Sequence, residues 1–197
     1  VDALAIDGDD FLGRRERYAE QLVVLPRLVD IHTHLDKGHI WPRRPNPDGS
    51  FKIADNPTGH KVEVARAKGA INSSAPAVTV QGLVVEKFAN GAQRGAIIGG
   101  SDWTIERNEV RLNHGVGIQT PAAERVKVLG NYVHHNGQLG IAGWRTTAAR
   151  YEGNELAFNN TAGFYNADWE AGGGKWTEST DLRVRNNHVH HNKAVGP

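Results

Sequence analysis

The sequence predicts an all-β protein in which residues 57–197 form a right-handed parallel β-helix, a solenoid of about five or six coils. Four segments share the pattern Asn-x-apolar-x-x-Asn-x-x-x-Gly, and further Gly and Asn residues separate short β-prone runs. The first Asn of each segment is Asn108, Asn131, Asn154 or Asn187. The first two steps are 23 residues long and the third is 33, which is one period plus a ten-residue insertion. A fixed period of this length is typical of coils that bury their apolar side only by stacking.

Each repeat places apolar residues at two constant positions, which we expect to point into the core. The first position holds Val110, Val133, Leu156 and Val189, and the second holds Ile105, Val128, Tyr151 and Val184. The repeated Asn residues are expected at turns, where Asn tolerates a left-handed backbone and stacked amides hydrogen-bond along the solenoid. A sharp corner is expected at the Gly of each repeat, namely Gly117, Gly140, Gly163 and Gly196. Weaker copies of the repeat begin near residues 61 and 78.

The composition limits the classes of partner and site. The chain has 197 residues and a formal net charge of +1, so neither nucleic acid nor a membrane surface is an expected partner. No segment approaches the roughly 20 apolar residues that a membrane span needs. There is no Cys, which excludes disulfides and thiolate metal sites. The absence of Cys fits any compartment, so the localisation stays open.

Residues 1–56 follow a different pattern, and we expect them to form a separate segment that caps the solenoid. Apolar and charged residues alternate at roughly helical spacing in 9–22, which predicts a short amphipathic helix. Strand-like runs at 22–25 and 28–31 are separated by Pro26. Three prolines make 41–49 a loop.

The four repeat blocks, together with the segment 169–176, resemble the right-handed parallel β-helix repeat family, which is related in fold to the pectate lyases. The resemblance covers about 70% of the chain. It implies the fold directly and the activity only broadly, because this fold hosts lyases, hydrolases, epimerases and proteins without enzymatic activity.

A second resemblance lies in the segment 25–39, Leu-Pro-Arg-Leu-Val-Asp-Ile-His-Thr-His-Leu-Asp-Lys-Gly-His. It is similar to the first barrel strand of the amidohydrolase superfamily, on the cytosine deaminase branch. The resemblance implies that His32 and His34 are metal ligands, for a divalent ion such as zinc. Two His residues at i and i+2 on a strand also face the same side, so both imidazoles can reach one ion.

This second resemblance stops near Phe51, before the rest of the (β/α)₈ barrel that the superfamily needs. The chain therefore looks like a chimera of an amidohydrolase start and a β-helix, and we expect no intact cytosine deaminase activity. Three alternatives stay open for His32 and His34. They are orphaned, they form a new metal site with a third ligand from His39, Asp36 or a solenoid His, or they hold a metal ion at a crystal contact or dimer interface.

Sites on β-helices tend to lie in a groove on the outer strand face, as the first resemblance implies. The insertion is predicted at 166–177, where Asp168, Glu170 and Lys175 stand between Trp169 and Trp176. Indoles stack against sugar rings and carboxylates supply an acid or a base, so this segment is a candidate for binding or processing a polysaccharide. The alternative is a surface loop whose Trp side chains pack on the solenoid.

Two His pairs, 134–135 and 190–191, recur at equivalent positions about two coils apart. Strand spacing separates them by roughly 9 to 10 Å, too far for one shared metal ion, so outward-facing His side chains in the ladder are expected. Because the repeat array ends abruptly at Pro197, we expect a homodimer or another end-to-end self-association that covers the last coil. Three functions remain: a polysaccharide-processing β-helix, a metal-dependent hydrolase at His32 and His34, and a non-catalytic scaffold.

Overall fold

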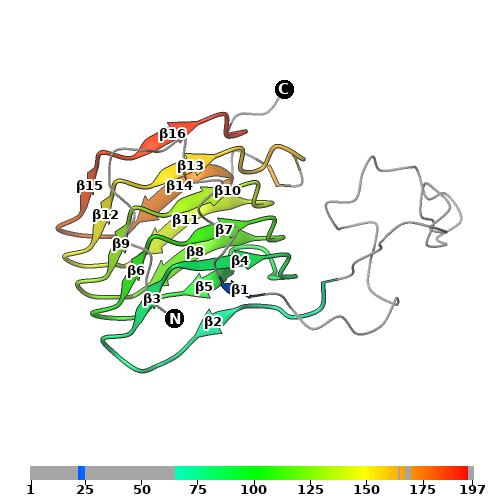
Figure 1. Cartoon of the computed structure of the whole chain (residues 1–197). Helices are drawn as coiled ribbons and strands as arrows, with labels where there is room; N and C mark the ends of the chain where they lie inside the picture. The colour runs from blue at the N-terminus through cyan, green and yellow to red at the C-terminus, as the bar shows by residue number, and fades with distance from the viewer. Residues whose placement is uncertain (1–21, 25–64, 164, 167–169, 195–197) are drawn as a thin grey trace, which may run out of the picture.

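The computed structural model describes residues 22–24, 65–163, 165–166 and 170–194. These residues form a right-handed parallel β-solenoid of about four complete coils, with a partial coil on either side (Figure 1). The predicted fold class is therefore confirmed. No helix within the described ranges is both long and apolar enough to span a membrane.

Three parallel sheets form the walls of the solenoid. Sheet A contains β1 (Leu22–Val24), β4 (Leu83–Glu86), β7 (Glu109–Arg111), β10 (Tyr132–His134), β13 (Glu155–Ala157) and β16 (His188–His190), in that spatial order. Sheet B contains β2 (Ile71–Asn72), β5 (Gly95–Ile98), β8 (Val116–Pro121), β11 (Leu139–Trp144) and β14 (Gly172–Thr177). Sheet C contains β3 (Thr79–Gln81), β6 (Thr104–Glu106), β9 (Lys127–Leu129), β12 (Arg150–Glu152) and β15 (Arg183–Arg185).

The two predicted apolar columns form the core. In sheet A the register pairs Val110 with Val133, Val133 with Leu156 and Leu156 with Val189. In sheet C it pairs Ile105, Val128, Tyr151 and Val184 in the same way. The members from the inner coils are fully buried, whereas Val184 and Val189 are 46% and 55% exposed. These two valines belong to the last described strands, over which no further described strand packs.

Two ladders of Asn side chains run along the solenoid, as predicted. In the first, Asn108, Asn131, Asn154 and Asn187 are linked through side-chain amides, each Nδ2 lying 2.9–3.0 Å from the Oδ1 of the next Asn. Each amide also donates to a backbone carbonyl; that of Asn131, for example, reaches the carbonyl of Ile105 at 2.9 Å. The second ladder links Asn113, Asn136, Asn159 and Asn192 in the same manner. Because the ladder amides of the inner coils are buried, each of their donors and acceptors needs the partner that stacking supplies.

The expected left-handed backbone at the ladder Asn residues was wrong. The positive φ angles belong to the residues just before them, such as Leu112, His135, Phe158 and His191, with φ of 52° to 55°. The Asn side chain must turn inward to reach the neighbouring coils, so the sharp bend falls one residue earlier. The corner thus constrains residues that face the outside of the solenoid.

The expected corner role was wrong for Gly117 and Gly140, which lie within strands β8 and β11, whereas Gly163 lies outside the strands and has a left-handed φ of 67°. A Cβ on Gly117 would lie 2.6 Å from Val133 Cγ1 and 3.0 Å from Asn136 Nδ2, so Gly is needed for close packing against the core and the second ladder. Strand pairing aligns Gly140 with Gly173 rather than with Gly163. The inserted residues therefore lie between Asn159 and Gly172, earlier than predicted. Gly196 lies outside the described residues.

From the first 56 residues the structure describes β1 alone, and it pairs in parallel with β4 in sheet A. The strand predicted at 22–25 is thus confirmed for Leu22–Val24. The predicted helix at 9–22, the strand at 28–31, the loop at 41–49 and the His pair at positions 32 and 34 lie outside the described residues.

Candidate functional site

Titratable side chains line the outer face of sheet A. Successive side chains of a strand point to opposite faces, so the residues flanking each inward Val or Leu point outward. The first outward column holds Val84, Glu109, Tyr132, Glu155 and His188. The second holds Glu86, Arg111, His134, Ala157 and His190. Acids, bases and aromatic rings are therefore stacked directly along the solenoid axis.

Glu109, His134 and His135 form the first hydrogen-bonded unit, which we call the first relay. The Nε2 of His134 lies 3.0 Å from Glu109 Oε1, and the Nδ1 of His134 lies 2.7 Å from the Nδ1 of His135. The side chains of Glu109 and His134 are 4% and 9% exposed. His135 is half-buried and takes up the left-handed corner.

The proton positions in the first relay follow from this geometry. Burial raises the pKa of Glu109, but the hydrogen bond from His134 and the charge of Arg111 outweigh it, so the pKa is lowered and Glu109 is an anion at neutral pH. An anion only accepts, so His134 Nε2 carries a proton. When His134 is neutral its Nδ1 accepts, and His135 must donate through its own Nδ1. That tautomer places the lone pair of His135 on Nε2, the atom of a general base.

Arg111 holds the carboxylates beside the first relay. Its Nη1 lies 2.6 Å from Glu109 and its Nε 2.5 Å from Glu86. Lys87 lies 3.6 Å from Glu86. Within the part of the chain that the structure describes, two carboxylates and two cations thus balance around the relay. A cleft of about 270 Å³ opens here, lined by Glu109, Arg111, His134 and His135.

Aromatic rings support the first relay. Tyr132 is buried and stacks on His134, with ring centroids 3.9 Å apart and ring planes 21° from parallel. Tyr132 also belongs to a small apolar cluster on this face, with Val84, Ala157 and Phe158. The imidazole of His134 is therefore held by a ring on one side and by a carboxylate at its edge.

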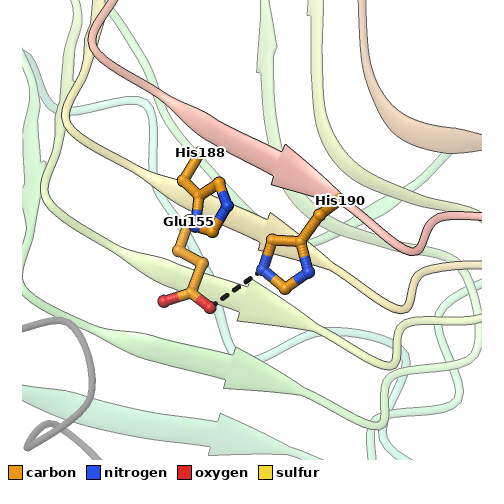
Figure 2. Close-up of side chains that lie close together, drawn as sticks. All are labelled: Glu155, His188 and His190. Atoms are coloured by element: carbon orange, nitrogen blue, oxygen red, sulfur yellow. Dashed lines mark hydrogen bonds and ion pairs between the residues drawn. The ribbon is translucent and has the colours of Figure 1, made fainter.

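A second relay repeats this arrangement two strands further along sheet A. The Nε2 of His190 lies 3.1 Å from Glu155 Oε1, and the Nδ1 of His190 lies 2.7 Å from the Nδ1 of His191. Figure 2 shows His188 and His190 projecting from the same strand over Glu155. One ligand atom from each of these three side chains lies within 4.8 Å of those of the other two.

Phe158 connects the two relays. Its ring is nearly parallel to those of His135 and His191, with centroids 5.0 Å away in both cases. All three residues occupy left-handed corners, with φ of 53°, 55° and 52°. The repeated corner geometry therefore sets the spacing of the stack.

Comparison with known proteins agrees with this architecture, since residues 58–197 match the model of the right-handed β-helix region. The chain belongs to the right-handed β-helix family. A stretch of 29 residues is 72% identical to the pterin deaminase of Rhizobium rhizogenes (strain K84 / ATCC BAA-868). That match covers 15% of this chain and 7% of the deaminase. No solved structure matches the chain.

The structure of this β-helix family member brings together only part of the predicted insertion site. Glu170 and Lys175 form an ion pair of 3.2 Å. Lys175 and Trp176 lie on strand β14 of sheet B rather than in a loop. The Trp176 ring packs edge-on against Tyr151 at 5.0 Å and against the core. Asp168 and Trp169 lie outside the described residues.

The predicted His pairs are on the outer face, but sequence reasoning missed their carboxylates and Tyr132. A signal was present in the repeat. Glu109 is one 23-residue period before Tyr132 and therefore sits beside it, diagonal to His134. Glu155 likewise sits beside His188 and diagonal to His190, but it precedes His188 by 33 residues, one period plus the ten-residue insertion.

Proposed function

We propose that the protein binds and processes a polysaccharide on the outer face of sheet A, with the first relay as its acid–base group. The observation that carries the proposal is the chain of short contacts from Glu109 through His134 to His135, in residues that line a cleft. The β-helix family, many of whose members act on polysaccharides, supports the substrate class.

In the proposed mechanism His135 is the base. It takes a proton through Nε2 from a sugar hydroxyl or a water molecule in the cleft. Its Nδ1 proton can then pass to His134, because the two Nδ1 atoms are 2.7 Å apart. Glu109 stabilises the imidazolium that forms on His134 without being protonated itself. A positioned base of this kind contributes typically about 10²- to 10⁴-fold in rate.

The charges around the cleft indicate the class of polymer. Glu86 and Glu109 are balanced by Lys87 and Arg111, so the described residues around the cleft carry little net charge. A polyanion would meet the two carboxylates that Arg111 already engages. We therefore expect a neutral polysaccharide to bind in preference to a strongly acidic one.

The test uses the full chain and a panel of neutral and acidic polysaccharides, with release of reducing ends and of unsaturated sugars as readouts. Glu109→Gln and His135→Ala are expected to lower kcat by about 10²-fold or more, since each interrupts the relay. Glu152→Gln is the matched control, because it removes an arginine-paired carboxylate on sheet C, away from the cleft. Full activity in the two relay variants would contradict the proposal. It would also be contradicted if the parent chain neither bound nor turned over any polymer of the panel.

The alternative function is a metal-dependent hydrolase at His32 and His34. The short identity to the pterin deaminase favours it, although that match covers 7% of the deaminase. If this alternative holds, the His32→Ala/His34→Ala double variant loses all hydrolytic activity, whereas Glu109→Gln keeps the activity of the parent chain. A protein that acts as a scaffold shows no turnover in either assay.

A further inference from the structure

We propose that Glu155, His188 and His190 bind a divalent transition-metal ion, with zinc as the best fit, and that His191 orients His190 for this role. This site is separate from the first relay and from His32 and His34. It does not depend on the polysaccharide function.

The two imidazoles approach from one strand. His188 and His190 are two residues apart on β16, so both point to the same face. Glu155 is paired directly with His188 on the adjacent strand β13. The three potential ligand atoms lie within 4.8 Å of one another, which is a span that one ion at about 2.0–2.2 Å from each can bridge with small rotamer changes.

Comparison with the first relay shows why Glu155, His188 and His190 suit a metal cation, whereas the equivalent residues of the first relay do not. His188 occupies the position that Tyr132 has two strands earlier, which supplies a third ligand. Ala157 occupies the position of Arg111, so the guanidinium that holds Glu109 has no equivalent beside Glu155 in this column. The second relay therefore gains a nitrogen ligand and, among the residues that the structure describes in this column, lacks the guanidinium that competes for the carboxylate in the first.

Metal binding requires a shift of tautomer in which His191 takes part. The Nε2 of His190, which now contacts Glu155 at 3.1 Å, is the atom that would face the ion and must lose its proton. His190 then carries its proton on Nδ1 and donates it to the Nδ1 of His191, 2.7 Å away. The His191 proton moves from Nδ1 to Nε2, so both rings stay neutral and no net proton is released. A ligating His that donates its other N–H in this way is oriented and made more basic.

The ligand set indicates the metal. Two imidazoles and one carboxylate suit zinc and its first-row neighbours, whereas calcium and magnesium prefer all-oxygen sets. Three protein ligands leave the fourth tetrahedral position to water. His188 is exposed and the His190 side chain is 21% exposed, so an ion has access from solvent.

The test titrates the chelator-treated full chain with zinc chloride by calorimetry, and with cobalt chloride by visible absorption. We run both titrations in the His32→Ala/His34→Ala background, so that any ion at that pair is removed from the count. One equivalent of zinc is expected to bind. Two variants are expected to weaken zinc binding by more than about 100-fold: Glu155→Gln, and His188→Tyr, which copies the arrangement of the first relay. This loss exceeds the roughly 10- to 100-fold that residues hydrogen-bonded to a metal ligand contribute. His134→Ala is the matched control and leaves zinc affinity unchanged.

The role of His191 has its own readout. His191→Ala is expected to weaken zinc by about 10- to 100-fold at unchanged stoichiometry. His191→Asn restores much of the affinity, since its carbonyl oxygen accepts from His190 Nδ1 and Asn tolerates the left-handed corner. The proposal is overturned if no equivalent binds in this background, or if His188→Tyr and Glu155→Gln bind zinc as tightly as the parent while their thermal melts show a folded chain.

Discussion

Tyr132 and His188 occupy the same outward position on strands β10 and β16, and each ring lies over the His two residues further along its own strand. The ring centroids are 3.9 Å apart for Tyr132 and His134, and 4.2 Å apart for His188 and His190. Each of these strands also lies next to a strand that supplies a Glu to the unit. The outer face of sheet A thus carries one arrangement twice, with a phenol in the first copy and an imidazole in the second.

The exchange of Tyr132 for His is predicted to convert the first relay into a metal site, provided that Arg111 is also removed. The double variant Tyr132→His/Arg111→Ala is expected to raise zinc stoichiometry by one equivalent, because it gains a ligand and frees Glu109 from its 2.6 Å ion pair. Tyr132→His alone should bind the extra ion more weakly, because the guanidinium still competes for Glu109. Calorimetric stoichiometry measures both, and an unchanged value in the folded double variant would show that the two relays are not equivalent.

The ladder Asn residues account for most of what the sequence predicts about the fold. An Asn fits at position 131 because its side-chain amide forms hydrogen bonds with residues of the next coil and of the preceding coil. These hydrogen bonds enforce the 23-residue period. The position of the insertion was not predictable in the same way. Gly163 and Gly173 both suit the pattern and differ by the length of the insertion, and the pairing of β11 with β14 decides between them.

The candidate site was predictable in part. The repeated His pairs were visible, and alternation along the strands placed them outside. The contact between the Nδ1 atoms of His134 and His135 was not, since it depends on the left-handed corner at His135. That corner is needed because the side chain of Asn136 must point inward. This requirement comes from the tertiary structure and cannot be predicted from local residue propensities. Residue type alone therefore gave the His positions but not their tautomers or their carboxylates.

Removal of a buried ladder amide is predicted to destabilise the solenoid more than removal of one at the last described coil. Asn131→Ala removes the side chain that bonds the carbonyl of Ile105 and the backbone N–H of Asn108, and it takes one hydrogen bond from each of the side-chain amides of Asn108 and Asn154. Each buried orphan costs about 1–3 kcal/mol, so we expect a loss of about 3 kcal/mol or more in the free energy of unfolding. Asn187→Ala, at a half-buried position, should cost about half as much or less. Urea denaturation compares the two, and equal losses would contradict a burial-dependent ladder.

Gly117→Ala is predicted to destabilise the protein because the new methyl group has no space. Its Cβ would lie 2.6 Å from Val133 Cγ1 and 2.8 Å from the carbonyl oxygen of Gly140, which as backbone cannot move aside easily. Overpacking of this kind costs about 1–3 kcal/mol in the free energy of unfolding. Gly91→Ala is the matched control, since nothing lies within 4 Å of its added Cβ. The melting temperature of Gly91→Ala should equal or slightly exceed that of the parent.

The ion-pair ladder on sheet C gives a prediction about acid stability. Glu152 lies between two arginines, 2.8 Å from Arg150 and 3.1 Å from Arg185. The hydrogen bond from Arg150, acting against desolvation and with smaller help from Arg185, lowers the pKa of Glu152 from 4.5 to about 2. A lowered folded-state pKa means that the unfolded chain binds the proton more readily, so Glu152 stabilises the fold above pH 4.5 and loses this effect as the pH falls through about 2.

Glu152→Gln is therefore expected to melt below the parent at pH 5 to 7, and the difference between them should shrink from about pH 4.5 downward and vanish near pH 2. The pair is partly open to water, so high salt should also reduce the difference at pH 7. Thermal melts across this pH range at low and high ionic strength measure both effects. A gap between parent and variant that stays constant down to pH 2 would mean that Gln at 152 acts through packing, and that the charge of Glu152 contributes nothing to stability.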